Sequence, residues 1–60
     1  MNTYHITFQN GVDKAKLKKI SVYGTLTYLG NNQYKIEVEE EKANLFIVIH
    51  SKNGVTIIPY

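Results

Sequence analysis

Four glutamates lie close together in the middle of the chain, at Glu37, Glu39, Glu40 and Glu41. Clustered carboxylates can bind metal ions, and a pair can do acid/base chemistry when an apolar environment shifts the pKa of one of them. Here the four acids fall where a strand is expected to lead into a helix. We therefore interpret them as a solvated charge cluster that stabilises the start of that helix.

Histidine and serine side chains are few: His5, His50, Ser21 and Ser51. Nucleophilic catalysis needs a cysteine, or a serine or threonine beside a positioned base. The chain has no cysteine, and the sequence neighbours His50 and Ser51 do not make a triad. We expect ordinary histidines at the surface or at the edge of the core, no bound metal and no cofactor. The inventory predicts a protein that is not an enzyme and works by binding.

Lysines supply all seven positive charges, and the net charge is +2 with no arginine. A nucleic-acid site on a lysine-rich helix would need aromatic side chains exposed on the same face as the lysines. The expected hairpin instead directs Tyr28 and Tyr34 toward the core, so we favour core tyrosines and a solvated lysine face. Nucleic-acid binding stays the alternative function, with the candidates Lys14, Lys16, Lys18, Lys19, Tyr23, Tyr28 and Tyr34.

The length of 60 residues allows a single domain, residues 1–60. Its first residues lack the basic and apolar segments of a signal peptide, and the longest apolar run, residues 45–49, is far shorter than the ~20 residues that span a bilayer. We expect a cytoplasmic protein with no membrane partner. Self-association would compensate for a small core, so a homo-oligomer is also considered.

Three elements can be placed in the first two thirds of the chain. Alternating apolar residues predict a strand over residues 3–9. Residues 13–23 have the spacing of a short amphipathic helix, with Asp13 as its cap and Gly24 as its stop. Residues 24–39 predict a hairpin with turn residues at its centre.

The register of this hairpin follows from matching apolar with apolar residues. A two-residue loop would oppose Tyr28 to Lys35, so we prefer a three-residue loop over residues 30–32. It pairs Leu29 with Gln33, Tyr28 with Tyr34, Leu26 with Ile36, Gly24 with Val38, Thr27 with Lys35 and Thr25 with Glu37.

The segment 39–53 is compatible with two different elements. Its acidic start favours a helix, whereas the β-branched composition of residues 45–49 favours a buried strand. Residues 52–54 can end a helix or turn a hairpin before a strand at residues 55–58, and Pro59 is tolerable only near an edge or end.

The fold depends on this choice. If residues 41–52 form a helix, the chain is an α+β, ferredoxin-like βαββαβ domain with two helices on one face of an antiparallel sheet. Otherwise it is an all-β, five-stranded small barrel. We favour the first, because two helices over one sheet face give a short chain a covered core.

The sheet face away from the helices is the predicted working surface. Threonines flank a few charges there and form a flat, modestly polar surface, open to a protein partner or a second copy. Edge strands around residues 25–29 and 55–60 add backbone groups that can pair with another chain. The predicted partner-binding residues are His5, Thr7, Thr25, Thr27, Lys35, Glu37, Ile58 and Tyr60.

Four segments carry a resemblance to a known family. They are the strand at residues 4–8, the lysine-rich helix leading to residues 24–27, the strand at residues 34–38 that runs into the acids, and the closing strand at residues 53–60. In this order the chain resembles the inhibitor I9 family, the propeptide-like domains and stand-alone inhibitors of subtilisin-type proteases. The expected function is a small protein-binding module, an inhibitor or modulator of an enzyme by steric occlusion.

Overall fold

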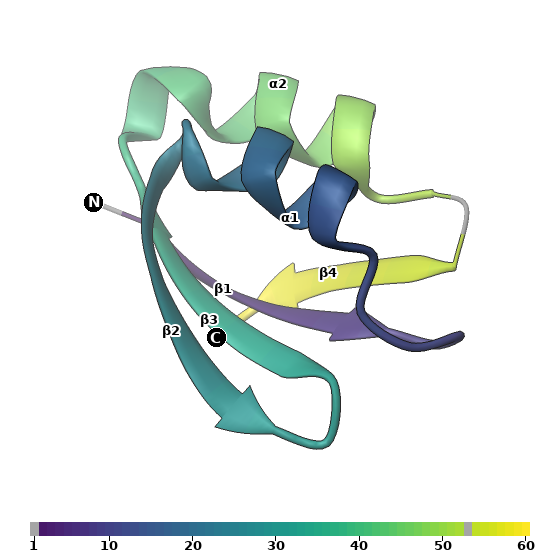
Figure 1. Ribbon diagram of the computed structural model, residues 1–60. Helices are drawn as coiled ribbons and strands as arrows, with labels where there is room; N and C mark the ends of the chain where they lie inside the picture. The colour runs from purple at the N-terminus through teal and green to yellow at the C-terminus, as the bar shows by residue number, and fades with distance from the viewer. Residues whose placement is uncertain (1, 53) are drawn as a thin grey trace.

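The computed structural model describes residues 2–52 and 54–60 of the chain. Its elements are β1 (Asn2–Phe8), α1 (Lys14–Ser21), β2 (Gly24–Gly30), β3 (Gln33–Val38), α2 (Glu40–His50) and β4 (Val55–Pro59). This is the predicted βαββαβ order (Figure 1). The ambiguous segment is therefore a helix, and the five-stranded barrel is wrong. Of the turn predicted at residues 52–54, Asn53 lies outside the described residues.

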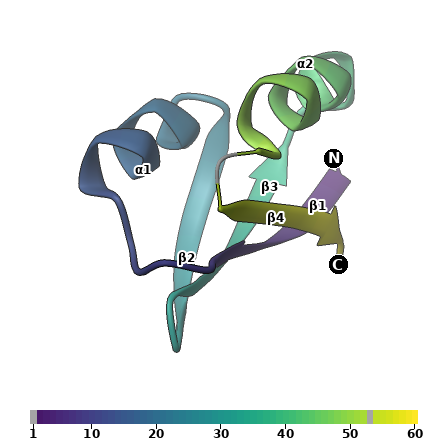
Figure 2. The same ribbon diagram turned by 90° about the vertical axis from the view of Figure 1, so that its right-hand side faces the viewer.

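The strands within the described residues form one antiparallel sheet in the order β2-β3-β1-β4. β1 is central, between β3 and β4. Both helices lie on the same side of the sheet (Figure 2), and in the described part of the chain the other side carries no helix. Since β4 is an edge strand, Pro59 has the edge position that its missing N–H requires.

The core lies between the sheet and the two helices. Every second residue of β1 faces it: Tyr4, Ile6 and Phe8 are buried, while the residues between them are only half-buried. The largest fully buried side chains come from β1, α1, β3 and α2 and are Phe46, Ile6, Ile20, Ile36 and Val38. The alternation predicted for the first strand thus sets one wall of the core and leaves the opposite face of the strand outside it.

The start of α1 is capped as predicted. Asp13 Oδ1 accepts hydrogen bonds from the backbone N–H groups of Ala15 and Lys16, at donor–acceptor distances of 3.0 and 3.3 Å. Such a cap satisfies N–H groups that have no partner inside the helix. Ile20 is buried below the helix, and Lys14, Lys18 and Lys19 are exposed.

The predicted end of α1 is wrong. The helix ends at Ser21 with Val22 as its C-cap, and Gly24 is the first residue of β2. A Cβ atom at Gly24 would overlap the backbone carbonyl group of Glu37 on β3. The glycine therefore permits the close approach of the two strands, a role that glycines also have inside sheets.

α2 buries one side of a segment that has strand-like composition. Ala43, Phe46 and His50 are buried, at the spacing of one helix face. The Phe46 ring packs against those of Tyr4 and Tyr23, at centroid distances of 5.9 and 5.5 Å. Because Phe46 contacts both the sheet and the turn that follows α1, tertiary packing outweighs the local strand preference.

The hairpin has the predicted register for five of its six pairs, from Tyr28–Tyr34 to Gly24–Val38. Its loop differs. Asn31 and Asn32 both have positive φ angles, 52° and 61°, as in a two-residue turn, and Gly30 rather than Leu29 pairs with Gln33. The pairing is irregular between Tyr28 and Gly30, and Leu29 is the extra residue there. The tighter turn is therefore compatible with the predicted register of the other pairs.

Tyr28 lies on the predicted side of the sheet, beside Tyr34, but the prediction that it is buried in the core is wrong. Its side chain is 62% exposed, because the hairpin extends beyond the two helices (Figure 1). Tyr34 is half-buried and packs edge-on against Phe8 at a centroid distance of 5.9 Å. Tyr28 packs on Tyr34 at 5.1 Å and covers it from the solvent side.

Candidate functional site

The uncovered sheet face gathers all eight predicted partner-binding residues. One row crosses the four described strands: Thr27 pairs with Lys35, Lys35 with His5, and His5 with Ile58. Directly paired residues of an antiparallel sheet share a face, so these four side chains lie side by side. The row joins residues that are far apart in sequence.

The neighbouring rows place the other predicted residues. Thr25 pairs with Glu37, and Glu37 pairs with Thr3. Thr7 lies between Gln33 and Thr56. Three members of this face are absent from the predicted set, Thr3, Gln33 and Thr56, although the alternation of residues along each strand places them with their neighbours.

Contacts between side chains order the centre of this face. His5 Nε2 donates a hydrogen bond to Gln33 Oε1 at 2.8 Å. The Tyr60 ring meets the His5 ring edge-on at a centroid distance of 6.1 Å, and Lys35 Nζ lies 5.6 Å from the centroid of the Tyr60 ring. The backbone N–H of Tyr60 donates to the Thr3 carbonyl at 2.9 Å, which holds the tyrosine beside β1.

Two apolar side chains at the β4 side of this face remain accessible. Ile58 is 50% exposed and Tyr60 is 68% exposed. Beside them lie half-buried His5 and Lys35. This arrangement offers apolar contact area, a cation and hydrogen-bonding groups on one surface, which suits recognition. Within residues 2–52 and 54–60, no group of three or more His, Cys, Asp or Glu residues is placed to hold a metal ion.

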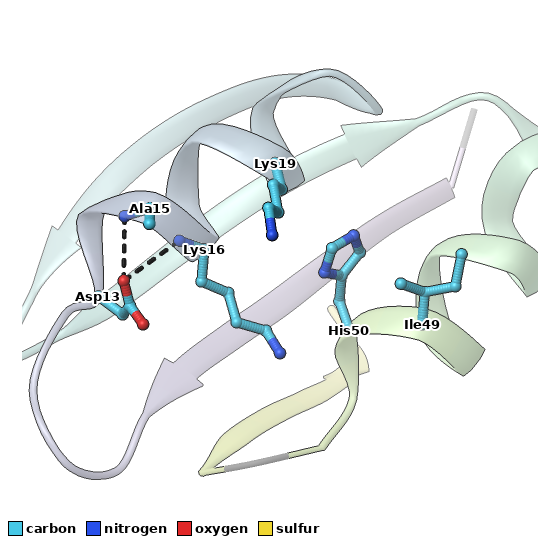
Figure 3. Close-up of a pocket in the computed structure, with 6 residues that line it drawn as sticks. All are labelled: Asp13, Ala15, Lys16, Lys19, Ile49 and His50. Carbon is cyan, nitrogen blue, oxygen red and sulfur yellow. Dashed lines mark hydrogen bonds between the residues drawn. The ribbon is translucent and has the colours of Figure 1, made fainter.

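A different kind of site lies on the helix side of the sheet. A pocket opens between α1 and α2 and is lined by Asp13, Ala15, Lys16, Lys19, Ile49 and His50 (Figure 3). His50 is only 5% exposed, and its Nδ1 atom has no hydrogen-bond partner among the described residues. The histidine thus lies at the edge of the core and also forms one wall of the pocket.

The electrostatic environment of His50 disfavours its protonated form. Burial lowers the pKa of His50 below its ordinary value of 6.5, and the positive charges of Lys16, Lys19 and Lys52 lower it further.

Sequence reasoning missed this pocket because it depends on the packing of two helices that are separated by a hairpin.

Comparison of the chain with protein families, curated proteins and solved structures finds no significant match. Within the described residues, neither helix has the length and apolar character needed to cross a membrane.

Proposed function

We propose that this protein is a small protein-binding module that uses the uncovered sheet face to cover part of a partner's surface. The observation that carries the proposal is the ordered cluster of His5, Gln33, Lys35 and Tyr60 at the centre of that face. Tyrosine and isoleucine side chains give contact area, and the cluster adds a charge and polar groups that select the partner.

Preorganisation favours binding by this face. Ordering a flexible side chain at an interface costs about 0.5–1.5 kcal/mol. Here Lys35 already lies over the Tyr60 ring, and His5 is already hydrogen-bonded to Gln33. Part of that ordering cost is met within the free protein, because rigid strands carry three of the four residues.

The size of the molecule sets the size of the interface. The accessible surface is 3994 Å² in total. A standard protein–protein interface buries about 800 Å² on each partner, which is roughly a fifth of this surface. We therefore expect the interface to use the whole sheet face together with the β4 edge, and to be blocked by one bulky change at its centre.

Inhibition by steric occlusion is the form of this function that we favour. A preorganised face can act on an enzyme by occupying the surface through which substrate enters. The resemblance to the inhibitor I9 family supports the same proposal. Lys35 and the exposed Tyr60 indicate a partner surface that combines acidic or carbonyl groups with an apolar patch.

The experiment is a pull-down with matched variants. The test variant combines Thr27→Arg with Lys35→Glu at the centre of the sheet face. The control combines Ser21→Arg with Lys18→Glu, which makes the same changes in charge at exposed positions of α1. We expect one stoichiometric protein partner that the wild type and the control capture and the test variant loses, with all three giving the same far-UV circular dichroism spectrum.

The identified partner then gives the second readout. If the partner is an enzyme, its rate should fall with wild-type protein added in equimolar amount and should not fall with the test variant. Capture that the two variants reduce equally, or capture of nucleic acid alone, would show that the sheet face is not the binding surface.

A further inference from the structure

The pocket between α1 and α2 has the dimensions of a small ligand site. Its volume is about 290 Å³, just below the range of roughly 300–1,000 Å³ for pockets that bind small molecules. Ala15 and Ile49 give it apolar walls, and the remaining lining residues are ionisable (Figure 3). The pocket lies on the opposite side of the sheet from the proposed protein-binding face, so the two sites are independent.

His50 indicates that the pocket accepts a polar ligand. The side chain is about nineteen-twentieths buried, at 5% exposure, and Nδ1 has no partner among the described residues. A buried polar atom without a hydrogen bond costs roughly 1–3 kcal/mol. The rings of Tyr23 and Phe46, at 5.3 and 5.9 Å from the imidazole, fix the orientation of His50. Figure 3 shows the imidazole facing the side chains of Lys16 and Lys19 across the gap.

The charges at the pocket select the sign of that ligand. Lys16 and Lys19 reach in from α1, and Lys52 follows α2 closely enough to affect the titration of His50. Asp13 supplies the negative charge on the lining, but its Oδ1 already accepts two backbone N–H groups of α1. The two lysines on the lining outnumber this carboxylate, and Lys52 adds positive charge nearby, so the pocket favours an anion.

We infer that this pocket binds a phosphate group, either as the free ion or as the monoester of a small molecule. Lys16 and Lys19 supply the compensating charge, as lysines do in many phosphate sites. The imidazole of His50 supplies the hydrogen bond that its buried position leaves unmade. Ala15 and Ile49 contact the organic part when the ligand is a monoester.

The first test is a titration of the isotope-labelled protein, followed by the NMR resonances of the His50 ring and of the backbone amides along the whole chain. Inorganic phosphate and phenyl phosphate are titrated separately. Tighter binding of phenyl phosphate identifies a monoester site, and equal affinity identifies a site for the free ion. Either result supports the inference when the shifts cluster at the pocket, and shifts spread over all seven lysines overturn it.

Matched lysine variants separate a site from a general charge effect. The test variant is Lys16→Gln with Lys19→Gln, and the control is Lys14→Gln with Lys18→Gln, on the same helix but outside the pocket lining. Both remove two positive charges. We expect the test variant to weaken phosphate binding by about tenfold, the factor that corresponds to 1.4 kcal/mol, and the control to change it less than about twofold. If both variants weaken phosphate binding equally, the lysines act only through general electrostatic attraction, and the inference is overturned.

His50 is tested through pH, with sulfate as a probe that remains a dianion. The groups that face the imidazole are Lys16 and Lys19 from α1, Lys52, Asp13 across the pocket and the Tyr23 ring. An anion beside the ring favours its protonated form, so sulfate should bind more tightly at about pH 5 than at about pH 8. The variant His50→Phe keeps an aromatic ring and should lose this pH dependence. An equal pH dependence in wild type and variant would remove His50 from the site.

Discussion

His50 makes the stability of the folded protein depend on pH. Its pKa in the folded protein is lowered from 6.5 by burial and by three lysines, whereas in the unfolded chain it returns to that value. The unfolded state therefore binds a proton more readily than the folded state. Below about pH 6.5 stability must fall, and the fall continues until the pH reaches the folded pKa.

We predict that the free energy of unfolding in anion-poor buffer decreases as the pH is lowered from about 7.5 to about 5. Urea denaturation at several pH values measures this. The variant His50→Phe keeps the contacts with Tyr23 and Phe46 but cannot titrate, so its curve should be flatter over the same interval. Parallel curves for the two proteins would mean that other groups cause the acid sensitivity.

Gly24 gives a second prediction for a single residue. In Gly24→Ala the new methyl group would overlap the Glu37 carbonyl, and strands must separate locally to accommodate it. Overpacking of this kind costs about 1–3 kcal/mol. The control is Gly11→Ala, where φ is +87° but no atom lies within 4 Å of the new Cβ, so only backbone strain is added. Thermal unfolding should show the larger loss for Gly24→Ala, and a larger loss for Gly11→Ala would contradict the contact argument.

At the level of elements, α2 shows where sequence patterns are sufficient and where they are not. The acids at its start predicted a helix, while the run from Leu45 to Ile49 was equally typical of a strand. The structure decides between them through the spacing of Ala43, Phe46 and His50, which places one side of the helix on the sheet. Leu45 and Val48 are left 54% and 72% exposed, so the local composition overstated the burial of this segment.

Adjacent residues of α2 should therefore respond very differently to truncation. Phe46 is fully buried, and Phe46→Ala should cost about 3–5 kcal/mol. A domain of this length has a total stability of about 3–9 kcal/mol, so most of it would be lost. Leu45→Ala, at a position 54% exposed, should change stability by less than about 0.5 kcal/mol. Equal losses, measured by chemical denaturation, would contradict the position of α2 on the sheet.

The hairpin shows a different limit of sequence reasoning. Matching apolar residues was enough to predict the pairs from Tyr28–Tyr34 to Gly24–Val38. The position of Leu29 was not predictable in that way, because an extra residue in one strand leaves the pattern beyond it unchanged. The exposure of Tyr28 was missed for a related reason: a pattern assigns a side of the sheet, but not how far the helices cover it.

At the level of the whole molecule, the sheet divides the chain into two surfaces with different chemistry. The uncovered face could be predicted almost residue by residue, because alternation along four strands determines which side chains share it. The helix side could not, because the pocket requires Lys16 and His50 to meet across two helices that are distant in sequence. A pattern within one segment of the sequence does not show that these two residues approach each other.

The lysine-rich helix gives a prediction that separates the two function classes. Nucleic-acid binding through α1 would weaken steeply with salt, because it depends on the release of counterions. The protein-binding proposal predicts that any gel shift with single-stranded oligonucleotides disappears at about 0.15 M salt. The variant Lys14→Gln with Lys18→Gln should remove a residual low-salt shift. A gel shift that persists at that salt concentration, and that the variant Thr27→Arg with Lys35→Glu gives equally, would favour the nucleic-acid alternative.

The central position of β1 has a consequence for how the chain reaches its native state. The β2–β3 hairpin joins residues close in sequence, whereas β1 pairs with β3 and with β4, as in the Tyr4–Pro59 pair. Closing long loops costs more entropy than closing short ones and slows folding. We therefore expect the hairpin to form early and the β1–β4 pairing to close last. Until that closure, one edge of β1 can pair with an extended segment of another molecule. We therefore expect the yield of refolding to fall as the protein concentration rises.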